Sequence, residues 1–510
     1  MSLPVLSEPW ILGTALASLA LVTAIGIWSW RRTRSARDFF IAGQGVGLWA
    51  TAMATMSAAF SGFVFLGGPG LTYRMGIGSL FIVLPVGFTA GLICWTLAKR
   101  LRLLAEVREV YTIPDAVACR FDNRGTTALA IVAIVIGTVG YLGSQLLALA
   151  ILFEALFDTR RLLGIWSLPT ALLLGLTVVV LYSVLGGMLA GVYTDLVQGV
   201  LMLVAALLVF WRALTVGGGL SAMVVSIADS DRFSGFFDPL GGVPAITALG
   251  FFFVFGIGVL GQPHMLHKFY MMKDPRQLRW MPLILAGSQA MCLLIWIGIG
   301  IAVPALVAQG RMIPLQLADD AAPRFLLGFV PPALTGLVVA GILAAVMSTA
   351  DSFLNIGAAA VIRDIPRLLL RRPVKKELTW GRWATVAVAL AAAALALTYG
   401  DLIALLGTFA FGTLGAALAP TLALGLNWKR VTAAAASASI ATGLGVTLLL
   451  EMLQSRPFSA TLGNWVMATG ALPAAVALAA SLTVLLVLSW LTGRRTEDKL
   501  SADMVAVMER

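Results

Sequence analysis

Long apolar stretches, each bounded by charged residues, proline or glycine, recur along the whole chain. A transmembrane helix needs about 20 mostly apolar residues, and by this criterion the pattern predicts about thirteen membrane-spanning helices. The expected fold class is therefore an all-α polytopic membrane protein. The predicted spans are about 9–30, 48–70, 75–98, 126–156, 165–186, 189–213, 244–266, 281–309, 329–361, 380–398, 401–427, 431–452 and 468–492.

Composition agrees with this pattern. Of the 510 residues, 60% are hydrophobic and only 12% are charged, which excludes a soluble exterior and a disordered chain. No segment between the predicted spans is long enough for a catalytic domain, and no P-loop or zinc-ligand spacing occurs. We therefore expect a protein that is not an enzyme and whose surroundings are a lipid bilayer.

The net charge of +11 has two possible explanations. In a soluble protein it would indicate nucleic acid binding, but cytoplasmic loops of membrane proteins are rich in Lys and Arg. An outside N-terminus places 27 of the 35 Lys and Arg residues on the inner side. This predicts a multi-pass protein of the cell (cytoplasmic or inner) membrane, with a cytoplasmic tail at 493–510, no nucleic acid partner and a monomeric state.

Polar residues on the ninth predicted span suggest a cation site. Ser348, Asp351, Ser352 and Asn355 recur at helical spacing and so share one face, with Thr349 beside them. Hydroxyl and carboxylate oxygens suit a small hard cation such as Na⁺. The alternative is hydrogen bonding between helices, which is common for Ser and Thr in membranes.

A second polar group follows Gly186 and Gly187, where we expect a tight turn between two spans. Thr194, Asp195 and Gln198 then lie near the cytoplasmic start of the sixth span. Asp195 either caps this helix or faces the cytoplasm, or it supplies charge to a cation path.

Two spans carry glycine and proline interruptions, at 55–70 and 255–264. They are five spans apart, as inverted five-helix repeats require. In such repeats the first helix of each repeat unwinds near the membrane centre, and its freed backbone groups bind ion and substrate.

These motifs resemble the sodium/solute symporter family. The resemblance rests on the runs at 186–198, 261–264 and 344–352 and extends over about 38–430. It implies a leucine-transporter-type core of five plus five inverted helices within a single transporter domain, about 1–500. Repeat one would cover 48–213 and repeat two 244–427, with an extra N-terminal helix at 9–30 and C-terminal helices at 431–492.

The resemblance also implies a sodium site between the second and ninth spans. Its ligands would be three backbone carbonyls and two hydroxyls: Ser57, Phe60 and Ala345, with Ser348 and Thr349. Some members have a second cation site, which maps here to Asp195, Asp351 and Ser352 together with Ser348. Lys268 is expected to act only as an orientation charge near the cytoplasmic end.

The nearest pattern is that of the proline-transporting branch, with departures at the solute positions. Ala59 replaces an acidic residue, and Phe255 and Val259 replace aromatic solute contacts, whereas Ser61 and Tyr141 match. The residues expected to bind solute are Ser61, Gly62, Tyr141, Phe255, Val259 and Gln262.

We therefore expect a symporter that uses Na⁺ as its coupling ion and imports a small organic solute by alternating access. The solute would be an amino acid such as proline, or a monocarboxylate. Two alternatives remain: a symporter-like membrane sensor that acts through a partner signalling protein, and a passive channel.

Overall fold

The computed structural model describes residues 8–32, 41–108, 110–372, 374–399, 403–454, 469–493 and 500–509. Of residues 30, 32, 182, 184–187, 189, 378, 399 and 454 it gives the helical assignment alone. The described chain is helical throughout, and its single extended pairing is a parallel bridge between Val46 and Met272.

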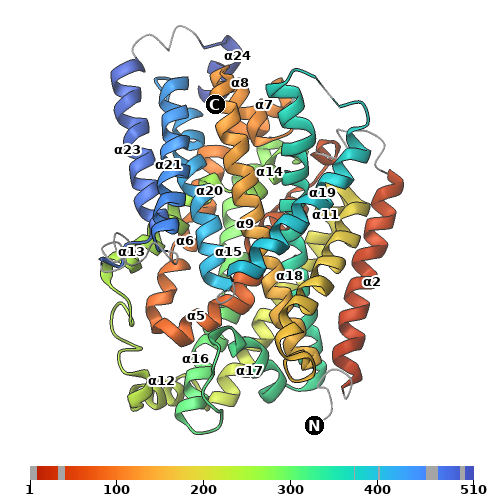
Figure 1. Ribbon diagram of the computed structural model, residues 1–510, viewed down its shortest axis with the longest axis vertical. Coiled ribbons are helices and arrows are strands. Elements are labelled where there is room, and N and C mark those ends of the chain that lie inside the picture. Colours follow the sequence, from red (N-terminus) through yellow and green to blue (C-terminus); the bar gives the residue numbers. More distant parts are fainter. Residues whose placement is uncertain are drawn as a thin grey trace.

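The helices fall into three groups (Figure 1). Long helices are α2 (Pro9–Arg32), α9 (Arg124–Phe157), α11 (Ser167–Gly217), α16 (Leu294–Ala308), α18 (Pro332–Ala359), α19 (Glu377–Tyr399), α20 (Ile403–Gly425), α21 (Ala433–Gln454) and α23 (Pro473–Thr492). The shorter α15 (Met281–Cys292) shares the apolar run Pro275–Ala308 with α16. Interrupted spans contain α4 (Leu48–Ala59), α5 (Gly68–Met75), α6 (Val86–Ile93), α7 (Lys99–Val107), α13 (Ala245–Ile257) and α14 (Pro263–Tyr270). Short connecting helices are α8 (Ile113–Phe121), α10 (Thr159–Leu163), α12 (Leu220–Ala228), α17 (Ala321–Phe329) and α24 (Ala502–Glu509).

The described residues contain 12 helices long and apolar enough to cross a membrane. The expected all-α polytopic fold is confirmed. The difference from the predicted thirteen arises in the 45-residue run Phe63–Val107, which joins the end of the second predicted span to the third. Gly76, with a φ of 62°, ends α5 inside this run. Glycine tolerates this left-handed backbone region because it lacks a Cβ atom.

Helix α11 contains two predicted spans, 165–186 and 189–213, within 51 residues of helical assignment. A straight helix of this length would measure about 76 Å, more than twice the thickness of a bilayer core. The turn that we predict at Gly186 and Gly187 falls among the residues for which only the helical assignment is given.

Contacts at the two ends of α11 show that the chain reverses direction inside it. Ser167, at its start, lines the same cavity as Leu317. Near its end, Nε of Arg212 donates a hydrogen bond to the carbonyl of Phe329. Both ends therefore lie on the same side of the molecule, as two antiparallel spans require.

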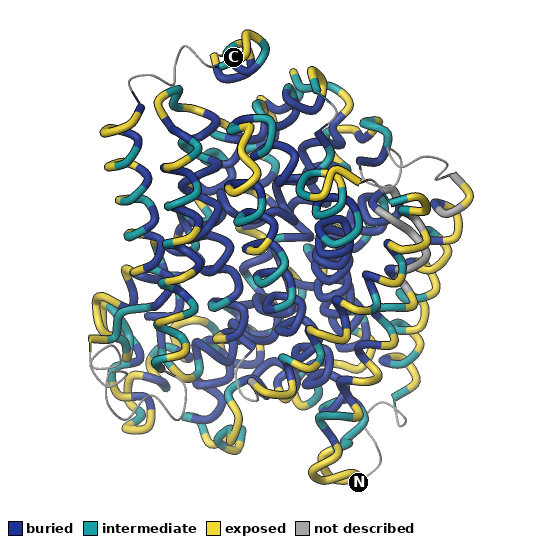
Figure 2. Tube along the Cα trace, turned by 45° about the horizontal axis from the view of Figure 1, so that its top comes forward, coloured by how far each residue is buried: buried dark blue, intermediate teal, exposed yellow. Residues whose placement is uncertain are grey.

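Burial divides the helices into a core and a shell (Figure 2). In α18 and α20, 83% and 89% of the apolar span is buried, against 17% in α2. Helix α2 therefore lies at the lipid-facing periphery, and α18 and α20 lie at the centre. Among the residues whose burial the structure describes, ten tryptophans are exposed, as expected of residues that anchor a protein at membrane interfaces.

The two marked chain ends lie at opposite ends of the molecule (Figure 1). Helices α12, α16 and α17 lie near the N-terminal end, whereas α8 and α24 lie near the C-terminal end. This arrangement agrees with an odd number of membrane crossings.

Candidate cation and solute site

The first interrupted span frees a backbone carbonyl. Helix α4 ends before Phe60, whose backbone is extended (φ −102°, ψ 102°), and helical turns resume in η2 (Phe63–Gly67). In a continuous helix, the N–H of Gly62 would donate to the carbonyl of Ala58. Instead it donates to Oε1 of Gln145, on α9, at 3.0 Å. The carbonyl of Ala58 is thereby available to another donor.

Two hydroxyl groups of α18 reach the end of α4. Ser348 Oγ donates to the carbonyl of Ser57 at 2.9 Å, and Thr349 Oγ1 donates to that of Ala58 at 3.2 Å. Both hydroxyls also contact the carbonyl of Ala345, at 3.2 and 3.1 Å. The three polar side chains at this junction, Ser57, Ser348 and Thr349, are fully buried.

This junction gathers hard oxygen ligands in a water-poor interior. Carbonyl and hydroxyl oxygens are the donors that small hard cations prefer, and an unwound helix is where membrane proteins supply them. Four of the five predicted sodium ligands, Ser57, Ala345, Ser348 and Thr349, lie together. The fifth, Phe60, lies in the break, but among the described contacts it is the Ala58 carbonyl that meets Thr349.

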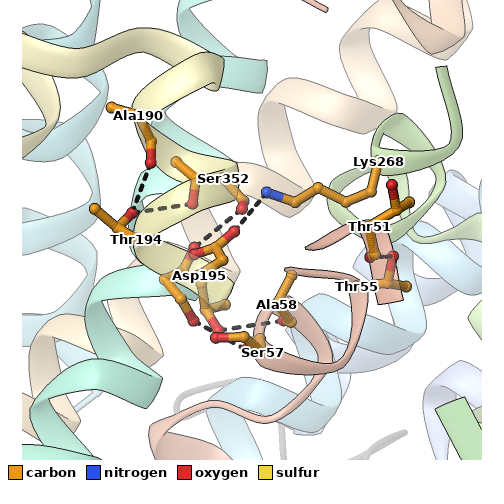
Figure 3. Close-up of polar contacts among 12 residues, drawn as sticks. Thr51, Thr55, Ser57, Ala58, Ala190, Thr194, Asp195, Lys268 and Ser352 are labelled. Atoms are coloured by element: carbon orange, nitrogen blue, oxygen red, sulfur yellow. Dashed lines mark hydrogen bonds and ion pairs between the residues drawn. The ribbon is translucent and has the colours of Figure 1, made fainter. Parts of the chain in front are cut away.

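A buried ion pair lies beside this junction (Figure 3). Nζ of Lys268, on α14, donates to Oδ2 of Asp195, on α11, at 2.7 Å, and each side chain is 1% exposed. The expectation that Lys268 serves only as an orientation charge is therefore wrong, because the side chain is inside the protein. Asp195 likewise does not face the cytoplasm; its ionic partner comes from another helix.

The other residues of the predicted second cation site lie near this pair. Asp351 is buried and lies within electrostatic range of both Asp195 and Lys268. Oδ2 of Asp351 packs against the backbone of Gly191. A Cβ atom built on Gly191 would lie only 2.8 Å from this oxygen. Gly191 is one helical turn before Asp195. Ser352 Oγ donates to the carbonyl of Ser348, one turn earlier on α18, at 3.0 Å.

The second interrupted span repeats the design of the first. Helix α13 is followed by η7 (Gly258–Gly261) and by Gln262, whose backbone is extended (φ −91°, ψ 98°), before Pro263 starts α14. Nε2 of Gln262 donates to the carbonyls of Gly258 and Phe411, at 3.1 and 2.9 Å. In both breaks, a glutamine amide bonds to a backbone group of the interrupted span: the N–H of Gly62 in the first and the carbonyl of Gly258 in the second.

Aromatic rings connect the two breaks. Phe255 stacks on Phe63, of the first break, with ring centroids 5.5 Å apart, and on Phe411, of α20, at 4.6 Å. Val259 is buried in η7 beside this stack. Three helices therefore meet through flat apolar faces at the centre of the molecule.

A second group of predicted solute residues adjoins the first break. The hydroxyl of Tyr141 lies 3.4 Å from Oγ of Ser61. The Tyr141 ring stacks on Phe353 at 4.7 Å, and the ring of His264 lies 4.2 Å from Phe353. The six predicted solute residues thus form two groups: Ser61, Gly62 and Tyr141 at the first break, and Phe255, Val259 and Gln262 at the second.

One structural cluster was not anticipated from the sequence. Arg363, on η10 (Ala360–Leu369), forms an ion pair with Asp115 at 2.6 Å, and Thr112 donates to Asp364 at 3.0 Å. Tyr270, at the end of α14, donates to the carbonyl of Thr112. These contacts join α8, η10 and α14 near the C-terminal end of the molecule. Charged residues at the edges of predicted spans were the only sequence signal.

Comparison with known proteins agrees with the geometry. The model of the sodium:solute symporter family matches residues 39–443. The sodium/proline symporter of Escherichia coli (strain K12) is 33% identical over 449 residues, covering 82% of this chain and 83% of that protein. The osmoregulated proline transporter OpuE of Bacillus subtilis (strain 168) is 30% identical over 440 residues, covering 83% and 85%. A sodium/pantothenate symporter of Haemophilus influenzae is 26% identical, covering 83% and 86%.

Solved structures share the fold. A substrate-bound, outward-open Na⁺-coupled sialic acid symporter aligns with a TM-score of 0.75 at 17% identity, covering 94% of this chain and 97% of that one. Mhp1, a nucleobase-cation-symport-1 family transporter, aligns with a TM-score of 0.56 at 14% identity, covering 92% and 98%. The family match spans most of the chain, and the helical architecture, the two breaks and the buried oxygen ligands agree with it. The chain belongs to the sodium:solute symporter family and carries out sodium-coupled solute symport.

Proposed function

We propose that this protein imports a small zwitterionic amino acid, with proline as the first candidate, by alternating access. The names of its relatives support proline, since two of the most similar ones are proline transporters. The pantothenate symporter among the relatives makes a carboxylate the feature that the named solutes share. No Arg or Lys lies among the six candidate solute residues, so backbone N–H groups at the breaks would hold that carboxylate.

The sodium ion would bind between α4 and α18. The observation that carries this proposal is the meeting of the Ser348 and Thr349 hydroxyls with the Ser57 and Ala58 carbonyls. A cation placed among these oxygens would replace their mutual hydrogen bonds. It would also fix the end of α4 against α18.

Coupling follows from the position of the break. Ser61 and Gly62 lie three to five residues after the carbonyls that would bind sodium, and they contact Tyr141 and Gln145. Sodium that fixes the end of α4 would therefore order the backbone that contacts the solute. The effect is reciprocal, because each ligand favours the state that the other needs.

The energy available is enough for strong accumulation. One monovalent ion that crosses 100 mV releases about 2.3 kcal/mol. At about 1.4 kcal/mol per tenfold change, this supports a roughly 50-fold solute gradient for one sodium ion, before any sodium gradient is added. We propose an N-terminus outside, a C-terminus inside and a monomeric transporter in the cytoplasmic membrane.

The test is uptake of radiolabelled proline into proteoliposomes. An imposed inward sodium gradient should drive uptake, and an equal potassium gradient should not. Unlabelled amino acids, acetate and pantothenate would then be tested as competitors. If sodium drives uptake of pantothenate or acetate but not of proline, the solute assignment is wrong.

The sodium site is tested by a double variant, Ser348→Ala with Thr349→Ala, which should abolish sodium-stimulated uptake. The matched control is Ser439→Ala with Thr447→Ala. These are also fully buried hydroxyls that donate to carbonyls, but they lie on α21, away from the breaks. Undiminished sodium dependence in the first variant would reject the site.

A further inference from the structure

Lys268 and Asp195 lie where a second cation site is expected. The ammonium group of Lys268 contacts the Asp195 carboxylate as a bound cation would contact its ligand. The ammonium group is 2.7 Å from the carboxylate, and both side chains are 1% exposed. A charge that is buried this deeply is tolerated only when it is paired. The lysine therefore provides the positive charge that Asp195 needs inside the membrane.

The surroundings offer more polar groups than one ammonium contact uses. Oδ1 of Asp195 is buried and has no hydrogen-bond partner in the described part of the chain. The same holds for both polar atoms of the Gln198 side chain, one turn further along α11. Buried polar atoms without partners are costly. The two oxygens among them, Oδ1 of Asp195 and Oε1 of Gln198, are potential ligands for a hard cation.

Charge balance limits how many further cations the region can hold. With both carboxylates ionised, Asp195 and Asp351 supply two negative charges and Lys268 supplies one positive charge. One negative charge remains, and Ser348, one turn before Asp351 on α18, is part of the sodium site. A single sodium ion at Ser348 and Thr349 therefore neutralises the buried set.

We propose that the ε-ammonium group of Lys268 is the permanent occupant of the second cation site. Each transport cycle then couples to one sodium ion, and loss of the lysine exposes a latent second sodium site at Asp195. This inference rests on the proposed sodium site at Ser348 and Thr349. It assigns Lys268 a role in setting the ion stoichiometry of transport.

The experiment counts sodium ions by thermal unfolding of the purified full-length protein. For an ion that binds only the folded state, stabilisation rises with the logarithm of its concentration, in proportion to the number of ions bound. The unfolding temperature is measured over a range of sodium concentrations, with choline replacing sodium at constant ionic strength. The Ser348→Ala/Thr349→Ala variant calibrates the slope for loss of the first site.

Wild-type protein should give the slope for one ion, and Lys268→Met should give twice that slope. Lys268→Arg keeps the positive charge and should retain the wild-type slope. Lys268→Met combined with Asp195→Asn removes both charges and should also give the wild-type slope. An unchanged slope in Lys268→Met would overturn the proposal.

The charge-neutral double variant decides the question even if Lys268→Met alone does not fold. If Asp195 binds sodium in the wild-type protein, the double variant loses one ion and its slope falls, which contradicts the proposal. If Lys268 occupies that position, the slope is unchanged. Failure of the Ser348→Ala/Thr349→Ala variant to change the slope would reject the first sodium site, independently of the result at Lys268.

Discussion

The hydrogen bond from Gly62 to Gln145 should control sodium affinity. In Gln145→Leu the N–H of Gly62 loses its buried acceptor, which costs about 1–3 kcal/mol. In a continuous helix this N–H would bond to the Ala58 carbonyl, and we expect the break to rewind toward that acceptor. Rewinding the break in this way removes the Ala58 carbonyl from Thr349 and from sodium.

The free-energy cost of the unpaired Gly62 N–H then favours the rewound state, which binds sodium poorly. A cost of 1–3 kcal/mol corresponds to a fall in sodium affinity of about 5- to 150-fold. We expect the sodium concentration for half-maximal uptake in proteoliposomes to rise by that factor in Gln145→Leu. Gln289→Leu is the matched control, since Gln289 is also a buried glutamine but lies within the helix α15 and not at a break. A half-maximal sodium concentration within twofold of the wild-type value in Gln145→Leu would refute the reasoning.

Three further predictions concern other contacts. Gly68→Ala places a Cβ atom 2.2 Å from the ring of Trp296. Overpacking of this kind costs about 1–3 kcal/mol of stability, so the melting temperature should fall. Adding Trp296→Leu should restore part of the lost melting temperature. Arg363→Met leaves the carboxylates of Asp115 and Asp364 buried without their ionic partner, a loss of about 3–5 kcal/mol. Adding Asp115→Asn and Asp364→Asn should recover stability in thermal unfolding, and an equally unstable triple variant would contradict this. Asp503, on α24, accepts hydrogen bonds from Arg108, and these hold the pKa of Asp503 below its ordinary value. The contact that docks α24 should therefore persist at neutral pH and weaken only as the pH falls through that lowered pKa. Hydrogen exchange of residues 502–509 at pH 7 should rise in Asp503→Asn.

The hydrophobic pattern was enough to predict the helical fold. Apolar stretches of span length are a local property, and so are the glycine and proline residues that mark both breaks. The hydroxyl pair at Ser348 and Thr349 was identified for the same reason, because polar residues are rare in an apolar helix. The structure brings this pair to Ser57, on a helix almost 300 residues earlier, as the resemblance implied.

Pairings between distant residues could not be predicted in this way. Lys268 and Asp195 are 73 positions apart, and each stands near the end of a predicted span, where a charge usually faces water. Only the packing of α14 against its neighbours places the lysine inside. The carbonyl that meets Thr349 depends in the same way on where the break begins, and there the Gly62 N–H donates to Gln145 from α9.

The stack of Phe63, Phe255 and Phe411 has a consequence for engineering the solute range. Phe255 lies between two flat aromatic faces. Replacing it with a small residue would open a narrow slot, bounded on both sides by rings, that favours planar compounds over branched ones. Directed evolution toward heteroaromatic cargo should therefore begin at this single position, whereas enlarging the slot for bulkier cargo requires coordinated changes on all three helices.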